Sequence, residues 1–219
     1  MTDAPVLRAA VADYGAGNLV SIRNALTLLG AEVVIAEDAG AITGADVVVV
    51  PGVGASRPAM ARLRRRGIDG AIERGLAHGT WYLGICLGLQ LLFERSDEDG
   101  ARMLGVLAGD VRRLTGAPRL PHIGWNELEP ARPHPIADAV RPGAPAYFVH
   151  SYAPVPADRG SVLFETVHGD RFTSAVATGR IVGFQFHPER SGEDGLRLLA
   201  ATLALVATDR GRSLLTSGA

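Results

Sequence analysis

Short apolar runs alternate with amphipathic segments along the first 95 residues. The runs have the length of strands, and the segments between them repeat apolar positions three or four residues apart, as helices do. The expected strands are 6–12, 32–37, 46–51 and 80–85. Helices are expected over 19–30 and 87–95, and helical stretches between about 58 and 78. Strands that alternate with helices predict βαβ units and a parallel sheet. DVVVVP at 46–51 is almost wholly β-branched, which is typical of a central strand covered on both faces.

The pattern changes after residue 100, where candidate strands follow one another without a convincing helix. They lie near 105–107, 111–114, 122–128, 147–152, 161–167, 172–177 and 181–187, and a final apolar helix is expected over 193–207. The sequence therefore predicts an α/β fold, with an open, mostly parallel central sheet flanked by helices and antiparallel strands added in the second half. We expect one domain over 1–208 and a loose C-terminal tail over 209–219.

Composition narrows the class of protein. The chain has 219 residues, a formal net charge of -1, a single cysteine and 22 basic residues, all of them arginine. The charge argues against a general nucleic-acid or membrane-surface binder. One cysteine excludes an intrachain disulfide framework, and we see neither a signal peptide nor an apolar run of membrane-spanning length, so we expect a cytoplasmic protein.

The single cysteine stands on a predicted sharp corner. Gly84-Ile85-Cys86-Leu87-Gly88 has the pattern G-x-C-x-G between a strand and a helix, the thiol counterpart of a nucleophile elbow. The start of the helix would favour the thiolate. A small buried hydrophobic residue at a glycine-rich strand end explains the pentapeptide equally well.

A nucleophilic thiol needs a base. Of the six histidines, His187 stands out because it ends the strand IVGFQFH and is followed by Pro188-Glu189. The proline favours extended backbone at His187, so the side chains of His187 and Glu189 project to one side, and the carboxylate can orient the imidazole. Taken alone, this tripeptide fits a surface turn equally well.

The segment PGVGAS follows the buried strand at 46–51 and should therefore lie at the carboxyl edge of the sheet. Gly52 and Gly54 would allow a backbone N–H to point inward, and the amide of Leu87 would be a second donor of an oxyanion hole. An ordinary strand-to-helix glycine turn is the alternative.

Three motifs in this order resemble the class I (triad) glutamine amidotransferases, which have a flavodoxin-like fold. GICLGLQLLFE resembles their nucleophile motif, FQFHPE their histidine and glutamate motif, and PGVG their oxyanion strand. The resemblance implies that Cys86 attacks the side-chain amide of glutamine, that His187 protonates the leaving ammonia, and that water hydrolyses the glutamyl thioester. It implies no cofactor, and the remaining histidines lack the spacing of metal ligands.

Within that class, five segments are most similar to the glutaminase subunits of imidazole glycerol phosphate synthase. They are DYGAGNLVSIRNAL, PGVGAS, PHIGWNELE, YFVHSY and QFHPERSGEDGLRLL, and together they cover roughly residues 8–205. The resemblance implies a heterodimer with a (β/α)8-barrel cyclase, which uses the ammonia in histidine biosynthesis to make imidazole glycerol phosphate and the aminoimidazole carboxamide ribotide.

The same resemblance assigns further roles. Val53 would supply the oxyanion amide after its peptide reorients, while Gln90, Glu98 and the backbone at Ser151 and Tyr152 would hold the substrate's polar head. The positions near the cyclase interface, where ammonia leaves, are His122, Trp125, Asn126, Tyr147 and Arg190. Arg190 replaces a usual lysine, and Ser56 replaces a usual aromatic residue beside the oxyanion loop.

Other interpretations remain open at this stage. RLRRR at 62–66 could bind phosphate or nucleic acid, although a solvated helix face explains it as well. The chain could supply ammonia to a different synthase, such as one for a surface sugar or a secondary metabolite. It could also be an inactive regulatory partner, or a cysteine hydrolase or peptidase that acts without a partner.

Overall fold

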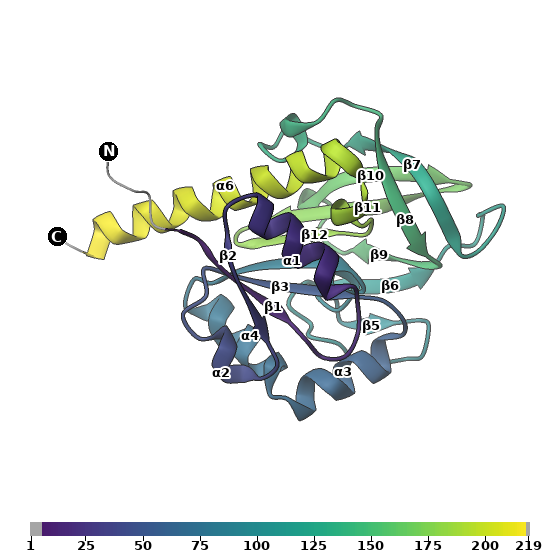
Figure 1. The fold of residues 1–219 in the computed structure, drawn as a ribbon. Coiled ribbons are helices and arrows are strands. Elements are labelled where there is room, and N and C mark those ends of the chain that lie inside the picture. Colours follow the sequence, from purple (N-terminus) through teal and green to yellow (C-terminus); the bar gives the residue numbers. More distant parts are fainter. Residues whose placement is uncertain (1–5, 218–219) are drawn as a thin grey trace.

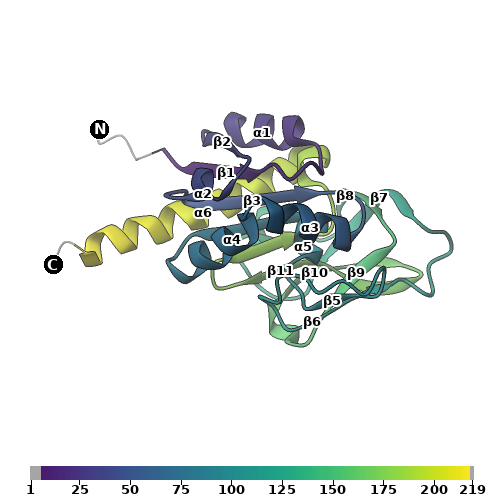
Figure 2. The ribbon, with the colours of Figure 1, turned by 90° about the horizontal axis from the view of Figure 1, so that it is seen from below.

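One large mixed sheet organises the molecule. The computed structural model describes residues 6–217, with side chains as far as Arg210. Within these residues, nine strands form a sheet in the order β2-β1-β3-β4-β12-β11-β10-β7-β8, and β5, β6 and β9 form a small second sheet. Helices cover both faces of the large sheet (Figures 1 and 2). This agrees with the predicted α/β architecture.

The elements of the first half alternate between strand and helix. They are β1 (Arg8–Ala12), α1 (Leu19–Leu28), β2 (Glu32–Ala36), α2 (Ala39–Ile42), β3 (Val47–Gly52), α3 (Ser56–Arg65), α4 (Ile68–Ala77), β4 (Trp81–Cys86) and α5 (Leu87–Gln90). The second half is mostly strand, with β5 (Arg95–Ser96), β6 (Gly109–Arg113), β7 (His122–Pro130), β8 (Ala144–His150), β9 (Tyr152–Pro156), β10 (Val162–His168), β11 (Asp170–Thr178), β12 (Ile181–Phe184) and α6 (Gly192–Ser217).

The change of pattern after residue 100 marks a change of strand direction. Strands β2, β1, β3, β4 and β12 are parallel neighbours, whereas β11, β10, β7 and β8 join the sheet by antiparallel pairing. Parallel strands need crossover connections, and the first half supplies them as helices. The prediction of added antiparallel strands in the second half is confirmed.

The alternation of side chains along β3 divides the core between the two faces. Val47 and Val49 pack in a cluster with residues of α1 and α6, and Val48 and Val50 pack in a cluster with residues of α3 and α4. Every residue of β3 and of β4 is buried. These two strands therefore form a rigid centre, and both end at the same edge of the sheet.

Several predicted elements differ from the structure. The helix expected over 87–95 ends at Gln90, and the strand expected at 105–107 is wrong, because the chain there is irregular. The two differences have one cause. The amides of Leu104 and Leu107 donate hydrogen bonds to the carbonyls of Leu91 and Leu92, and the predicted helix would have used the Leu91 carbonyl internally. The short elements α2, β5 and β9 were not predicted.

The last helix is longer than predicted. It continues to Ser217 rather than ending near 207, and the predicted tail begins inside it. Asp209 accepts hydrogen bonds from Trp81 and Arg180, and Arg210 forms an ion pair with Asp46. Residues 218 and 219 and the side chains from 211 onward lie outside the described part of the chain, so a loose end there stays a prediction. No helix of the described residues is long and apolar enough to cross a membrane.

Candidate active site

Cys86 occupies a strained corner between β4 and α5. Its φ of 53° and ψ of -106° make it the one non-glycine residue of residues 6–217 with a positive φ. The glycines on either side are sterically required: a Cβ at Gly84 would lie 2.6 Å from the carbonyl of Gly88, and one at Gly88 would lie 1.7 Å from the carbonyl oxygen of Val50. Strain of this kind gathers at functional sites, where the surrounding structure maintains it.

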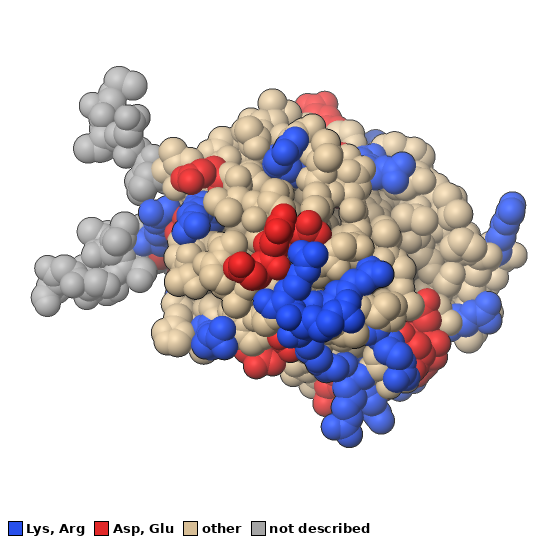
Figure 3. Space-filling view, turned by 60° about the horizontal axis from the view of Figure 1, so that its bottom comes forward, with Lys and Arg blue, Asp and Glu red and all other residues tan. Residues whose placement is uncertain are grey.

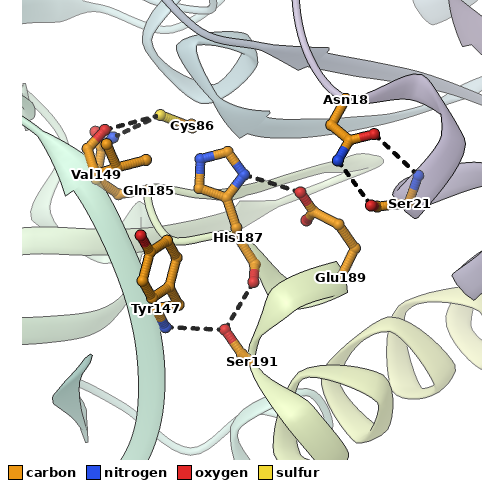
Figure 4. A network of polar contacts seen from close by, with 9 residues as sticks. All are labelled: Asn18, Ser21, Cys86, Tyr147, Val149, Gln185, His187, Glu189 and Ser191. Carbon is orange, nitrogen blue, oxygen red and sulfur yellow. Dashed lines mark hydrogen bonds and ion pairs between the residues drawn. The ribbon is translucent and has the colours of Figure 1, made fainter. Parts of the chain in front are cut away.

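His187 and Glu189 form a buried pair beside this corner. Nδ1 of His187 lies 2.8 Å from Oε1 of Glu189, and the two side chains are only 7% and 3% exposed. Because a carboxylate accepts hydrogen bonds, Nδ1 carries a proton. The ring lies between Glu189 and Cys86, with its other nitrogen on the side of the sulfur (Figure 4). Nε2 is buried and outside hydrogen-bond geometry with any partner, so it is available to a reacting group.

The backbone at His187 is braced from β8. The His187 amide donates to the Tyr147 carbonyl over 2.9 Å, and Ser191 Oγ donates to the His187 carbonyl while accepting from the Tyr147 amide. These bonds fix the imidazole relative to β8 (Figure 4).

The electrostatics of the site favour a charged imidazole. Burial by itself lowers the pKa of His187, but the interactions with Cys86 and Glu189 outweigh burial and raise the pKa to about 10. At neutral pH the ring therefore holds a proton next to the sulfur. Helix α5 has only four residues, so the expected contribution of its dipole is smaller than the sequence suggested.

A small cavity opens at Cys86, at the carboxyl ends of β3 and β4. It has a volume of about 160 Å³. Eight of the residues assigned from the sequence line it, namely Val53, Gly54, Cys86, Leu87, Gln90, Glu98, Ser151 and Tyr152, together with Pro121, Val149 and His150. A larger cavity of about 520 Å³ lies at the opposite ends of these strands, around Asp46 and Trp81, and contains no cysteine.

Gly52 does not line the cavity but packs behind it. A Cβ at this position would lie 2.0 Å from the hydroxyl of Tyr14, which donates a 2.8 Å hydrogen bond to the Pro51 carbonyl. Tyr14 is thus a buried support of the PGVG segment. Sequence reasoning did not assign it a role, although it belongs to the quoted segment DYGAGN.

Arginines in and directly after helix α3 bind the loops around Asp13–Gly15 and Asp99. Arg62 donates to the Gly15 carbonyl over 2.9 Å, Arg66 donates to the Asp13 carbonyl, and Arg57 donates to the Asp99 carbonyl. Arginine side chains gather on the face shown in Figure 3. Arg62 and Arg66 of RLRRR are thus bound to the protein's own carbonyl groups, and all four arginines of the run lie on the exposed surface, as a solvated helix face predicts.

The groups expected to hold a substrate's polar head are partly engaged with each other. Nε2 of Gln90 donates to the Tyr152 carbonyl over 2.9 Å and to Oε1 of Gln185 over 3.1 Å. Gln185 in turn places its Nε2 3.6 Å from the Cys86 sulfur. Sequence reasoning missed Gln185, although it lies within the quoted FQFHPE.

Glu98 lies at the rim of the cavity. Desolvation and repulsion from Asp99 raise the pKa of its carboxyl group, and a hydrogen bond from the Ser56 backbone partly opposes the rise. Ser56 itself is fully buried, and its hydroxyl has no hydrogen-bond partner. The small side chain is therefore accommodated without a polar contact of its own.

The expected interface residues are divided between the two faces of the hairpin β7–β8. Trp125 is 58% exposed and makes an edge contact with Tyr147, with ring centroids 6.0 Å apart, and the Arg190 guanidinium lies 4.5 Å above the Tyr147 ring. We call the exposed Trp125 and Ile123, with the half-buried Tyr147 of the neighbouring strand, the exposed aromatic face. His122 is buried on the other side of the hairpin, and Asn126 is half-buried.

Among the described residues, no group of three or more histidine, cysteine, aspartate or glutamate side chains is arranged so that it could hold a metal ion.

The sequence pattern of the family described as "Glutamine amidotransferase class-I" matches residues 10–204. The chain belongs to the class-I glutamine amidotransferases. Two solved structures share the fold. One is titled "Crystal structure of glutamine amidotransferase" (TM-score 0.72, 22% identity, 90% of this chain and 98% of that chain), and the other is titled "Structure of PurLQS from Thermotoga maritima" (TM-score 0.72, 22% identity, 92% and 100%).

Curated relatives within the class-I amidotransferases are more similar in sequence. The protein of Symbiobacterium thermophilum named "Imidazole glycerol phosphate synthase subunit HisH" is 46% identical over 194 residues, which cover 88% of this chain and 92% of that protein. The protein of the same name from Xylella fastidiosa is 48% identical over 200 residues, covering 90% and 98%.

Proposed function

We propose that this chain is the glutaminase subunit of an imidazole glycerol phosphate synthase, with Cys86, His187 and Glu189 as its catalytic triad. The observation that carries the proposal is the imidazole of His187, held by Glu189 at 2.8 Å and directed at the single thiol on its strained corner. The names of the relatives, at 46% and 48% identity, support the choice of synthase.

The chemistry follows from this arrangement. The Cys86 thiolate attacks the side-chain carbonyl carbon of glutamine, and the negative charge that develops on oxygen is stabilised by backbone amides, for which we propose Val53 and Leu87, with Gly52 and Gly54 shaping the turn. His187 gives its Nε2 proton to the amide nitrogen, so that ammonia leaves and a thioester forms. Water then attacks the thioester, Nε2 takes up its proton, and glutamate and the thiolate are released.

The cavity is suited to one small polar substrate. It is smaller than the roughly 300–1,000 Å³ of pockets for drug-sized ligands, and polar groups from four separate segments meet in it. We propose that Gln90, Glu98 and the backbone at Ser151 and Tyr152 hold the polar head of glutamine, at the end of the cavity away from the sulfur.

The ammonia would pass to a cyclase subunit bound at the exposed aromatic face. An exposed tryptophan and a half-buried tyrosine beside an arginine have the composition of an interaction hot spot, and Arg190 stacked on Tyr147 belongs to the same surface. Ammonia in water is mostly ammonium, which is not a nucleophile, so transfer through a covered passage preserves the reactive form. We place the reaction in the cytoplasm, where a lone thiol remains reduced.

The test is glutamate release from glutamine by the purified chain, alone and with the barrel cyclase of the same organism and its nucleotide substrate. We expect a low rate alone and a rate that is higher by orders of magnitude in the mixture. Cys86→Ala should remove glutamine-dependent synthesis while synthesis from added ammonia continues, because the acceptor chemistry belongs to the partner. Release that the cyclase does not stimulate would point to a different synthase, and loss of ammonia-dependent synthesis in an intact complex would contradict the division of labour.

A further inference from the structure

A buried chain of hydrogen bonds connects the hairpin β7–β8 with the Cys86 cavity. It runs from Asn126 through His122 and His150 to the Tyr152 carbonyl. A second branch runs from that carbonyl through Gln90 and Gln185 to the sulfur. The two histidines have no part in the proposed triad, although they are buried close to it, at 4% and 6% exposure.

The chain begins at an amide whose orientation is determined by its neighbours. Nδ2 of Asn126 donates to the Val167 carbonyl over 2.9 Å, and Oδ1 accepts from the Glu127 amide over 2.8 Å. A flipped amide would place its oxygen against the Val167 carbonyl oxygen, which are both acceptors, and its nitrogen against the Glu127 amide, which are both donors. The second hydrogen of Nδ2 is therefore free to bind Nε2 of His122, 3.3 Å away.

This orientation dictates the tautomers of both histidines. Since Nε2 of His122 accepts, its proton is on Nδ1, which donates to Nε2 of His150 over 3.2 Å. His150 must then carry its proton on Nδ1, which donates to the Tyr152 carbonyl over 2.9 Å. The register of the hairpin, in which His122 and His150 are directly opposite, brings the rings together.

The second branch is determined in the same way. The Tyr152 carbonyl can only accept, so Gln90 must present its amide nitrogen to it, and the other hydrogen of that nitrogen goes to Oε1 of Gln185. Gln185 is left with its own amide nitrogen facing the sulfur at 3.6 Å. The second branch therefore ends in a hydrogen-bond donor beside the sulfur.

We infer that His122 and His150 are positioning residues for the glutaminase reaction, which hold the Tyr152 carbonyl, and through it Gln90, in the orientation that binds substrate. This inference rests on the proposed function, and it assigns to His122 a role inside the protein in addition to its place near the interface. A proton added to either ring would break the chain, because each Nε2 is an acceptor.

The surroundings keep both rings neutral. Burial, together with the nearby His168, lowers the pKa of His122 to about 4. Burial is also the largest cause that lowers the pKa of His150 to about 3; the hydrogen bond to the Tyr152 carbonyl opposes this shift, and the neighbouring histidines add to it. His122 is stacked between His168, at 4.0 Å between ring centroids, and Phe148, at 4.9 Å, so its plane is fixed by packing as well as by hydrogen bonds.

Two matched substitutions at His150 test the inference. His150→Asn retains a donor in the place of Nδ1 and so keeps the bond to the Tyr152 carbonyl, whereas His150→Gln reaches the place of Nε2 and keeps only the contact with His122. In the complex with the cyclase, we expect KM for glutamine to rise about tenfold in His150→Gln, the loss of roughly one hydrogen bond, with kcat within about twofold of wild type. His150→Asn should remain within about twofold in both constants.

A second pair at His122 repeats the test if a variant at His150 fails to fold. His122→Asn keeps a donor toward His150, while His122→Phe keeps the stacking but leaves the tautomer of His150 undetermined. We expect only His122→Phe to raise KM. Equal KM values within each pair, whether normal or raised, would overturn the inference, because a purely structural role would not distinguish the donor positions.

Binding to the isolated chain separates this inference from the proposed function. Cys86 is the only cysteine, so its alkylation by iodoacetamide, and the glutamine concentration that protects it, can be measured without turnover. Protection of wild type that weakens in His150→Gln but not in His150→Asn supports the inference. Protection that is equal in both variants overturns it, and a wild-type chain that glutamine does not protect overturns the proposed glutaminase together with the inference.

Discussion

Nδ1 of His187 lies 2.8 Å from Oε1 of Glu189, in a site where both side chains are almost completely buried. A carboxylate in this position determines the tautomer of the ring and stabilises its protonated form. The second oxygen, Oε2, is buried without a hydrogen-bond partner. The charge of Glu189 is thus directed to a single neighbour, the imidazole.

We therefore expect Glu189→Gln to reduce kcat for glutamine hydrolysis by about 10²–10⁴-fold, the range seen when a general acid–base group loses its orienting partner. The amide keeps an acceptor for Nδ1 but removes the charge that stabilises the imidazolium. Glutamate release by the complex measures the effect. Glu193→Gln, at an exposed residue of α6 paired with Arg197, is the matched control and should have wild-type turnover, and equal activity of the two variants would exclude Glu189 from the triad.

The neutral histidine pair predicts loss of stability in acid. The folded pKa values of His122 and His150, about 4 and about 3, lie below the unfolded value of about 6.5. The unfolded chain therefore binds more protons between these values, and the free energy of unfolding falls as pH drops from about 6.5 toward 3. Urea unfolding at several pH values measures the slope, which should be smaller in His150→Asn. An identical slope in that variant would show that the loss of stability has another origin.

The contact between α5 and β3 predicts a strong steric effect at Gly88. An alanine Cβ there would lie 1.7 Å from the Val50 carbonyl oxygen, so Gly88→Ala must displace the corner that carries Cys86. We expect a decrease of about 3 kcal/mol or more in the free energy of unfolding, measured by denaturant titration.

Gly70→Ala is the control for Gly88→Ala, because it lies in α4 and its Cβ would meet only the flexible end of Arg74, at 3.2 Å. That substitution should be neutral or stabilise the protein by up to about 1 kcal/mol, since alanine favours the helix. If Gly88→Ala were as stable as Gly70→Ala, the packing of the corner against β3 would not be as described.

A substitution in the exposed aromatic face should weaken binding of the cyclase but leave the free energy of unfolding of this chain nearly unchanged. Trp125 is 58% exposed, so Trp125→Ala should change the free energy of unfolding by no more than about 0.5 kcal/mol. Its loss from a hot spot should weaken binding of the cyclase by about 2 kcal/mol, or roughly thirtyfold in Kd. Calorimetric titration of the two subunits measures Kd, with Leu28→Ala, an exposed residue of α1 outside this face, as the control. Equal Kd values for the two variants would place the interface elsewhere.

The sequence predicted the long elements well because their signals are local. The β-branched run of β3, the helical periodicity of α1 and the glycine-flanked Cys86 each require only neighbouring residues to be recognised. Helix α5 was predicted too long because Leu104 and Leu107, more than ten residues away, take the carbonyls that would have continued it. The short strand β9 is likewise defined by its pairing with β6, which leaves little trace in its own residues.

For the site, the sequence by itself determined which groups carry the chemistry: the thiol of Cys86 on a corner that needs glycine at 84 and 88, and a histidine two residues before a glutamate. Only the tertiary structure decided how those groups are oriented. His150 lines the cavity, Tyr14 packs behind it against Gly52, and Gln185 faces the Cys86 sulfur, each from a separate strand or loop. The direction of their hydrogen bonds depends on partners far away in the chain, as for Gln185 and Cys86, which are 99 positions apart. Spacing along the sequence encodes backbone geometry, whereas tautomers and amide orientations are set by which donors and acceptors the folded sheet brings together.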